Sequence, residues 1–366
     1  MEHIVVHSAG GYDKLRLEQH PTPEPGPGEV LVRTEASGVN YADVAVRRGL
    51  YASAQQFVGW PITPGFEFAG VVEAVGGQAA GFGRGDRVLG VTRFGAYATH
   101  VVVPAHQLFT MPPSFSFEEA AAFPAAFMTA HYALFQNIVL RPGMTLLVHS
   151  AAGGVGTALL QLGKLAGCRI IGVVGTRRKV ETARAFGADE VIDKSTGNLW
   201  ARAREHAPAG YDVVLDANGV STLRQSYEHL RPTGKLIVYG FASMLPRSGA
   251  SMNYARLIWD YARTPRFNPL RMTGENRSVI AFNLSFLFDR RDLLVPAMQQ
   301  LLRWVGEGKI RAPRCHAYAL ADAADAHRAL ESGETTGKLV LLTAPGRSQH
   351  GRVHIPDAQA RASTTA

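Results

Sequence analysis

The chain has 366 residues, of which 46% are hydrophobic and 19% are charged, and a formal net charge of +8 at pH 7. This length allows two domains with separate cores, because one core rarely exceeds about 250 to 300 residues, and the composition excludes a chain that is disordered throughout. The charge comes mostly from arginines spread along the chain without a long basic run, so we do not expect a nucleic-acid partner.

The cysteines and the N-terminal segment bear on the compartment. Only Cys168 and Cys315 occur, and their positions give no reason to pair them, so no disulfide framework is expected. The N-terminal residues lack the basic and apolar regions of a secretory signal, and no apolar run approaches the roughly 20 residues of a membrane span. We therefore expect a cytoplasmic protein without a membrane span.

The first part of the chain, residues 1–122, is expected to be mostly β. Short alternating runs separated by glycines predict strands over residues 30–36, 68–76, 85–90 and 97–103. Many short strands of this kind favour a compact, barrel-like domain. From Phe117 the pattern becomes helical, and a helix over residues 118–122, capped by Ser114 or Ser116, is predicted to continue over residues 124–135.

A glycine-rich turn comes next. Ala151, Gly153 and Gly156 occupy the three positions of the G-x-G-x-x-G dinucleotide fingerprint, between a predicted strand and a predicted helix. An ordinary strand-to-helix turn has a similar sequence, but a second strand over residues 169–174 completes the strand–helix–strand unit of a dinucleotide-binding fold. We therefore expect a cofactor pyrophosphate to bind the backbone of Ala152, Gly153, Gly154, Val155 and Gly156.

The residues after the second strand indicate which cofactor is bound. They are Thr176, Arg177, Arg178 and Lys179, and no acidic residue lies between the end of the strand and Glu181. A carboxylate here would bind the ribose 2′-hydroxyl of NAD, whereas Arg and Lys pair with the 2′-phosphate of NADPH. These four residues therefore predict NADPH, although an exposed basic turn that opens a helix would have the same sequence.

Strands and helices alternate in the rest of the chain, which predicts a parallel, doubly wound sheet. The strands are expected over residues 190–192, 211–216 and 234–240, with a closing strand over 337–342. The helices are expected over residues 179–186, 221–230, 253–264, 289–306 and 317–331. Residues 345–366 are small and polar, so we expect this tail to be disordered.

Several motifs together resemble a known superfamily. They lie in residues 38–43, 49–51, 64–70 and 85–88, beside the glycine turn and the closing strand. The chain resembles the zinc-independent medium-chain dehydrogenase/reductases, in the quinone oxidoreductase (zeta-crystallin-like) group, and is closest to its vesicle-amine-transport-like branch. The resemblance implies an α/β fold in two domains: a GroES-like β-rich catalytic domain of residues 1–122 and 288–344, and a Rossmann NADPH-binding domain of residues 123–287.

Two departures from the zinc-dependent members of this superfamily bear on the chemistry. Asn40 stands where those enzymes carry a cysteine ligand, and Phe66 stands where they carry a histidine ligand. A catalytic zinc needs about three protein ligands, so we expect no metal. Without a Lewis acid, hydrogen bonds must polarise the substrate, which favours quinones and α,β-unsaturated carbonyl compounds over simple alcohols.

The resemblance gives three residues to the catalytic site, and each has an alternative reading. Asn40 would offer an amide donor near the nicotinamide and the substrate carbonyl, or would be a turn residue. Asp43 would act in the site, or would only cap the next helix. Tyr51 would give a proton to a nascent enolate, since tyrosine is protonated at neutral pH. When the substrate is a quinone, water could supply the proton in place of Tyr51.

The resemblance also extends the set of cofactor-binding residues. Lys194 would lie near the adenosine phosphate, in place of a tyrosine in several relatives, and Lys338 begins the closing strand. The nicotinamide end would be bound by Asn40, Thr129, Gly240, Phe241, Phe282, Asn283 and Leu284, the last three in a covering strand. His149, before the glycine turn, is expected to be structural.

The leading hypothesis is an NADPH-dependent reductase of quinones or activated alkenes, acting as a homodimer joined near the strand of Phe282. The alternative is an NADPH-binding protein that acts through a partner, a lipid surface or RNA. Asn40, Tyr51 and Thr129 favour catalysis, because a binding protein needs no such residues around the nicotinamide. An apolar small-molecule substrate is suggested by Phe57, Trp60, Met244 and Trp259, which could equally be core residues.

Overall fold

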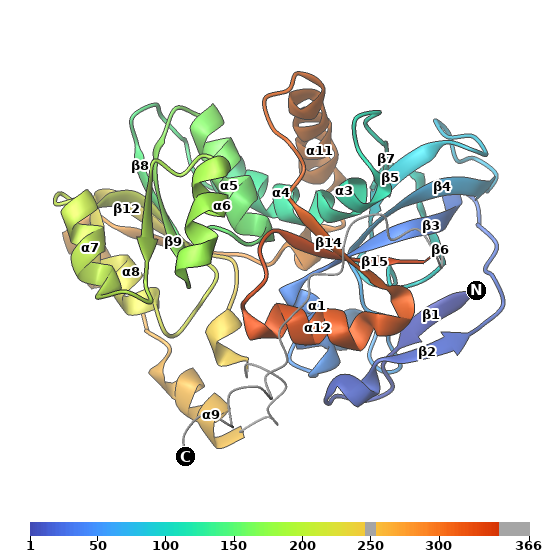
Figure 1. Cartoon of the computed structure of the whole chain (residues 1–366), viewed down its shortest axis with the longest axis horizontal. Coiled ribbons are helices and arrows are strands. Elements are labelled where there is room, and N and C mark those ends of the chain that lie inside the picture. The colour runs from blue at the N-terminus through green and yellow to red at the C-terminus, as the bar shows by residue number, and fades with distance from the viewer. Residues whose placement is uncertain (246–253, 344–366) are drawn as a thin grey trace, which may run out of the picture.

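The computed structural model describes residues 1–245 and 254–343. Two large sheets lie side by side, a parallel sheet and a mixed sheet, with helices between them and around them (Figure 1). The predicted tail of residues 345–366 and the first residue of the predicted helix 253–264 lie outside the described residues.

The mixed sheet contains strands from both ends of the chain. Its order is β14-β15-β3-β4-β5-β7, and β6 pairs with β3. All of its neighbours are antiparallel except β14 and β15, which are parallel. The strands are β3 (Glu29–Val39), β4 (Glu67–Val75), β5 (Arg87–Val91), β6 (His100–Pro104), β7 (Leu108–Thr110), β14 (Cys315–Ala319) and β15 (Lys338–Leu342). β1 (Glu2–Val5) and β2 (Arg16–Gln19) form a separate two-stranded sheet, which is bonded to the segment before β6 through His3 and Ala98.

The second sheet is parallel throughout, in the order β10-β9-β8-β11-β12-β13. This is the strand order of the doubly wound dinucleotide-binding fold, and it confirms the predicted fold class. The strands are β8 (Thr145–Val148), β9 (Arg169–Val174), β10 (Glu190–Asp193), β11 (Tyr211–Asp216), β12 (Leu230–Val238) and β13 (Ser278–Ala281).

Both faces of the parallel sheet are covered by helices. Consecutive apolar side chains of a strand point to opposite faces, so each of them is buried. Leu146 and Val148 pack on the face covered by α4 (Pro124–His131) and α5 (Gly154–Leu165), while Leu147 packs on the other face. That other face is covered by α7 (Leu199–His206) and α8 (Leu223–Glu228), as Figure 1 shows. The continuous apolar runs of these strands follow from burial on both sides.

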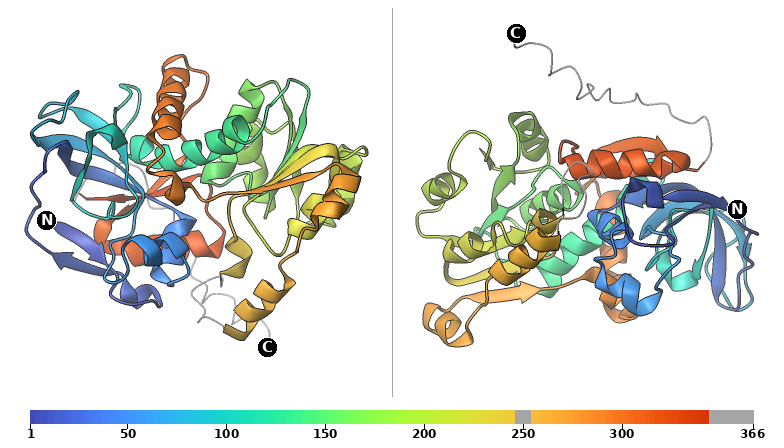
Figure 2. Two further views of the ribbon diagram at one scale, coloured as in Figure 1. Left: turned by 180° about the vertical axis from the view of Figure 1, so that it is seen from behind. Right: turned by 90° about the horizontal axis from the view of Figure 1, so that it is seen from below.

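The remaining helices connect or cover the two sheets. Ser116 caps α3 (Phe117–Ala122), where its hydroxyl accepts from the Glu119 backbone and the Glu119 carboxylate accepts from the Ser116 backbone, which confirms one of the two predicted caps. Figure 2 shows the arrangement from behind and from below. The other helices are α1 (Tyr41–Arg47), α2 (Ala52–Phe57), α6 (Val180–Ala185), α9 (Tyr254–Arg263), α10 (Pro269–Glu275), α11 (Arg291–Gly306) and α12 (Ala323–Ser332).

Two predicted elements were wrong. Residues 317–331 were expected to be one helix, but Cys315–Ala319 form β14 in parallel register with β15, and the helix begins only at Ala323. Sheet pairing here outweighs the helical propensity of alanine. Residues 282–284 were expected in a strand, but β13 ends at Ala281 and a 3₁₀ turn follows over Leu284–Leu287. The Asn283 side chain accepts from the Ser285 backbone and so starts this turn.

The distribution of strands between the sheets agrees with a β-rich unit built from both chain ends and a nucleotide-binding unit between them. The proposed boundaries at residues 122/123 and 287/288 remain predictions. Across the described residues, we find no helix with the length and apolar character needed to cross a bilayer.

Candidate active site

The glycine turn is shaped for close approach by another molecule. Gly156 cannot carry a side chain, because an added Cβ would lie 2.8 Å from the Ala151 Cα and closer still to the Ser150 carbonyl oxygen. Ser150 itself has a left-handed backbone, with φ of 54°. The backbone N–H groups of Gly154, Val155 and Gly156 bond no other group among the described residues. Three free donors thus meet at the positive end of α5, as an anion-binding site requires.

The glycine turn also touches the mixed sheet. Gly153 forms a parallel bridge with Gly337, whose N–H donates to the Ala152 carbonyl at 2.9 Å. An added Cβ at Gly154 would lie 2.5 Å from the Lys338 Cδ, so the lysine stem runs directly over the turn. The nucleotide-binding turn and the first residues of β15 are therefore packed together.

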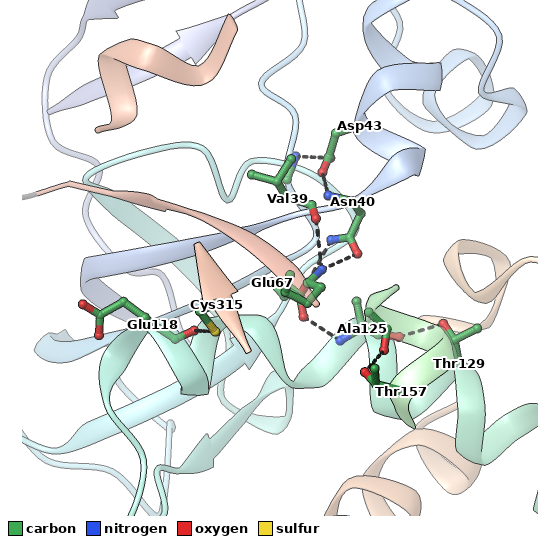
Figure 3. A network of polar contacts seen from close by, with 12 residues as sticks. Val39, Asn40, Asp43, Glu67, Glu118, Ala125, Thr129, Thr157 and Cys315 are labelled. Atoms are coloured by element: carbon green, nitrogen blue, oxygen red, sulfur yellow. Dashed lines mark hydrogen bonds and ion pairs between the residues drawn. The ribbon is translucent and has the colours of Figure 1, made fainter. Parts of the chain in front are cut away.

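Lys338, Glu67 and Asn40 form a hydrogen-bonded cluster at the end of β3. The Lys338 ammonium lies 2.6 Å from the Glu67 carboxylate and 2.6 Å from the Asn40 side-chain oxygen. It also donates to the Val39 carbonyl at 3.1 Å. The Asn40 side-chain nitrogen donates to the same Glu67 oxygen at 2.9 Å. Figure 3 shows Asn40 and Glu67 turned toward each other within this network.

Glu67 extends the cluster to the first turn of α4. Its second carboxylate oxygen accepts from the Ala125 backbone N–H at 2.7 Å (Figure 3). One turn later, the Thr129 hydroxyl donates to the Ala125 carbonyl at 2.7 Å. A carboxylate near a helix N-terminus is favoured by the helix dipole. Glu67 therefore fixes the position of Asn40 relative to the helix that carries Thr129.

Asp43 is fully buried and holds the turn into α1. Its carboxylate accepts from the Asn40 N–H at 2.8 Å, the Gly65 N–H at 2.8 Å and the Tyr97 hydroxyl at 3.0 Å. Burial raises the pKa of Asp43 to about 7, against the opposing effect of these hydrogen bonds. The bond from the Asn40 N–H is the capping contact that the sequence allowed for Asp43, and a role of Asp43 in the site stays a prediction.

A buried polar chain continues from Asp43 to α12. The Tyr97 hydroxyl lies 3.1 Å from the His327 ring, and the other ring nitrogen lies 3.4 Å from Arg47. Arg47 donates to Glu331 at 2.9 Å, and Arg48 also donates to Glu331. Burial lowers the pKa of His327 well below its ordinary value, so the ring is neutral. This chain ties the base of the site to the C-terminal helix.

Tyr51 connects the two parts of the molecule. Its hydroxyl donates to the Asn283 side-chain oxygen at 2.9 Å, across 232 positions of sequence. Its ring meets Phe66 and Phe94 edge to face, at centroid distances of 5.6 and 6.4 Å. Burial raises the pKa of Tyr51 above its ordinary value, so the phenol keeps its proton at neutral pH. Asn283 and Tyr51 were both predicted site residues, and the structure brings them into contact.

The basic turn after β9 forms a cationic patch. Lys179 donates to the Gly333 carbonyl at 2.6 Å, and Arg178 lies 3.1 Å from Glu334. Burial, with Arg178 and then Lys194 adding like-charge repulsion, lowers the pKa of Lys179 to about 8. The Thr176 hydroxyl is buried and has no hydrogen-bond partner among the described residues.

The other predicted cofactor residues lie at the ends of the parallel strands. Gly240 follows β12 and leaves no room for a side chain, because an added Cβ would lie 2.9 Å from the Ala217 carbonyl. Phe241 is exposed, and Phe282 packs edge to face on Tyr132 at 4.9 Å. Leu284 packs against the main core. None of these residues contacts Asn40 or Lys338 through a hydrogen bond in the described part of the chain.

His149 lies in the core of the parallel sheet, as expected for a structural residue. It is fully buried at the end of β8, and its ring lies 3.1 Å from the Ser226 hydroxyl. Ser226 in turn donates to Asp216 at 2.8 Å. Burial lowers the pKa of His149, so the neutral ring is the form held in this core.

Sequence reasoning missed Glu67, which joins Asn40 and Lys338 to the first turn of α4. Glu67 lies within the 64–70 motif, but the sequence around a single acidic residue at the start of a strand does not show which residue it will pair with. Lys338 was predicted as a cofactor residue, and its hydrogen-bond partners among the described residues are Val39, Asn40 and Glu67. Over residues 1–245 and 254–343, no group of three or more His, Cys, Asp or Glu side chains is placed to hold a metal ion.

Two family descriptions match this chain. Residues 26–113 match the alcohol dehydrogenase GroES-like domain, and residues 186–341 match the zinc-binding dehydrogenase family. The first region contains Asn40, Glu67 and most of the mixed sheet, and the second begins directly after α6 and ends within β15.

Individual relatives cover almost the whole chain. It is 36% identical over 349 residues to the synaptic vesicle membrane protein VAT-1 homolog of Rattus norvegicus, which covers 93% of this chain and 84% of that protein. It is 35% identical over 336 residues to the quinone oxidoreductase of Pseudomonas aeruginosa, covering 91% of this chain and 97% of that protein. The solved structure of Escherichia coli quinone oxidoreductase complexed with NADPH is similar, with a TM-score of 0.81, 29% identity, and coverage of 94% of this chain and 100% of that chain. The chain therefore belongs to the medium-chain dehydrogenase/reductase superfamily, in the group that contains the quinone oxidoreductases and the VAT-1 homologues.

Proposed function

We propose that the protein is an NADPH-dependent, zinc-independent reductase of quinones or activated α,β-unsaturated carbonyl compounds. The observation that carries this proposal is the Asn40 amide, which Glu67 and Lys338 hold beside the glycine turn, with one N–H that has no partner among the described residues. A preorganised donor of this kind stabilises negative charge on a substrate oxygen. Relatives named as quinone oxidoreductases support the same assignment.

The residues present fit NADPH. The free N–H groups of Gly154, Val155 and Gly156 suit a pyrophosphate, and the cations Arg178 and Lys179 suit a 2′-phosphate. The buried Thr176 hydroxyl, which lacks a partner among the described residues, offers one more polar contact. A solved relative, a mycobacterial protein with 32% identity and a TM-score of 0.80, is described as complexed with NADPH.

The chemistry divides between the cofactor and the chain. When bound, NADPH supplies a hydride. Asn40 donates to the substrate oxygen that becomes negative, and Tyr51 holds a phenolic proton that an enolate can accept. Asn283 orients the Tyr51 hydroxyl until the substrate competes for it.

We include in the proposal a cytoplasmic location and a homodimer joined at the edge strand β13.

Removing the basic turn should change cofactor preference. We expect the combined substitution of Arg177, Arg178 and Lys179 by alanine to raise the KM for NADPH by about 10- to 100-fold, with little change for NADH, since charge-assisted bonds contribute roughly 1.5 to 3 kcal/mol each and these positions are partly exposed. Steady-state kinetics with both cofactors measures this effect. In the native protein, the KM for NADPH should also rise above pH 8, as Lys179 loses its charge.

The control for this experiment is Arg184→Ala in α6. Arg184 is exposed and pairs with Glu181 at 3.2 Å, so its loss removes a positive charge next to the turn without removing a predicted phosphate contact. It should leave both Michaelis constants near their native values. Equal increases for NADPH and NADH in the triple variant would contradict the assignment of the turn.

Tyr51→Phe should separate the two substrate classes. The variant keeps the ring packing against Phe66 and Phe94 but has no proton to give. A general acid contributes about 100- to 10,000-fold, so enone turnover should fall by about 100-fold or more, while quinone turnover, which water can complete, should change little. Parallel assays with one enone and one quinone make the comparison. Unchanged enone turnover would remove Tyr51 as the proton donor.

A further inference from the structure

We propose that Lys338 is a positioning residue that acts through Asn40: its ammonium group orients the Asn40 amide and polarises it, so that the free Asn40 N–H becomes a stronger donor to the substrate oxygen. The proposal rests on the reductase function given above. It assigns to the first residue of β15 a part of the work that a metal ion performs in other hydride-transfer enzymes.

The contacts fix which way the Asn40 amide faces. An ammonium group has only donors, so the Asn40 atom 2.6 Å from Lys338 Nζ must be the oxygen. The nitrogen then lies on the other side, 2.9 Å from a Glu67 oxygen that accepts its N–H. Lys338 and Glu67 together hold the Asn40 amide in one orientation. The side-chain amide of an asparagine in an exposed turn would not be held in this way.

The Lys338 ammonium has no donor left for a cofactor phosphate. Its three N–H bonds go to the Val39 carbonyl, the Asn40 side chain and the Glu67 carboxylate. The Lys338 side chain is 5% exposed and the Glu67 side chain is fully buried. We therefore infer that Lys338 influences the site through Asn40 rather than by binding the cofactor directly.

Hydrogen bonds joined in a chain strengthen one another, most of all away from water. The cation bound to the Asn40 oxygen draws electron density from the amide, which makes both N–H bonds better donors. One N–H is taken by Glu67, and the other has no partner among the described residues. Asn40 is also the only member of the Asn40–Glu67–Lys338 cluster that is not buried, so its free N–H is the donor that a substrate can reach.

A double-mutant cycle tests the proposal. Lys338→Met should lower kcat by about tenfold or more, the size expected for losing a charged hydrogen-bond partner, with a smaller effect on KM. Asn40→Ala should lower kcat at least as much. Because Lys338 acts through Asn40, adding Lys338→Met to Asn40→Ala should cost little more. Two effects that simply multiply would show a general structural role and overturn the proposal.

Lys338→Met leaves the Glu67 carboxylate buried and unpaired, which by itself can prevent folding. The variant Glu67→Gln with Lys338→Met avoids this problem, because it is neutral and keeps groups that can bond Asn40 and the Ala125 N–H. It should fold and have a lower kcat than Glu67→Gln alone, which loses the same carboxylate but keeps the cation, and Lys338→Arg should restore part of the activity. Lys164→Met removes an exposed lysine paired with Asp189 and should have native kinetics. Native kcat in the neutral double variant would contradict the proposal.

A readout without turnover separates this inference from the proposed function. The side-chain amide protons of Asn40, identified in nuclear magnetic resonance spectra by their loss in Asn40→Ala, report polarisation directly. Both should lie further upfield in the neutral double variant than in Glu67→Gln, which loses the same carboxylate but keeps Lys338, and equal shifts in these two variants would overturn the proposal. If the native protein reduced no acceptor but the shifts changed as expected, the polarisation by Lys338 would stand and the reductase function would fail.

Discussion

Gly156→Ala is expected to weaken NADPH binding by about 5- to 150-fold, because overpacking costs about 1 to 3 kcal/mol and here falls on the binding turn itself. An added Cβ overlaps the backbone of Ser150 and Ala151, so no side-chain rotation can relieve the overlap. The turn must open, and its free N–H groups then lose the geometry that suits a pyrophosphate. Titration of NADPH against protein fluorescence measures the change.

Gly306→Ala is the control, at a glycine outside the turn. Gly306 is the last residue of α11, and an added Cβ there would meet no atom within 4 Å. NADPH affinity should stay near the native value. If Gly156→Ala bound NADPH as well as Gly306→Ala, this turn would not be the pyrophosphate site.

The second large effect concerns Asp43 and pH. Its pKa is raised to about 7 in the folded protein, above the value of 3.8 for a free aspartate, so the folded state binds more protons than the unfolded state between these pH values. Its contribution to stability is therefore complete below about pH 4 and is lost as the pH rises to about 7, a change on the order of 4 kcal/mol. Asp43→Asn carries no proton to lose, so the difference in unfolding free energy between native and variant should decline across this range.

Urea unfolding at several pH values makes this measurement. His327, whose pKa is lowered, has the opposite sign and destabilises the fold as the pH falls, but it is present in both proteins and cancels in the difference. A difference that stayed constant from pH 4 to 8 would show that Asp43 remains ionised in the folded chain. It would also show that burial is not the main influence on the pKa of Asp43.

The sequence predicted the nucleotide-binding half because its signals are local. Strand, glycine turn and helix follow one another within residues 146–162, and the alternation of strands and helices afterwards fixes a parallel sheet. The close approach of Gly156 to Ser150 joins residues that are near each other in the sequence, so it depends on the turn itself and not on distant parts of the chain. The same is true of the Ser116 cap of α3.

The centre of the candidate site could not be predicted in the same way, since its contacts join distant parts of the chain. Glu67 and Lys338 are separated by 271 positions, and only the pairing of β15 with β3 and of β3 with β4 brings them together. The alanine-rich segment before Ala323 was misassigned for a related reason. Its strand conformation depends on β15, which lies later in the sequence.

Groups of the protein itself hold Asn40, which stands where the zinc-dependent members of the superfamily carry a cysteine ligand. Lys338 and Glu67 hold the amide from one side, and Asp43 holds the Asn40 backbone from the other. The buried chain through Tyr97 and on to Glu331 anchors Asp43 in turn. A single amide is thus placed by partners from β4, β15 and α1, next to the glycine turn.

The most direct test of the central claim is NADPH oxidation by the purified protein, followed by absorbance against a panel of quinones, enones and aldehydes. NADH is assayed in parallel, and a chelator is present throughout. The account predicts that a quinone or an enone is reduced with NADPH, faster than with NADH and without sensitivity to the chelator. Tight binding of NADPH without turnover of any acceptor would contradict the reductase function and favour a protein that binds NADPH and acts through a partner.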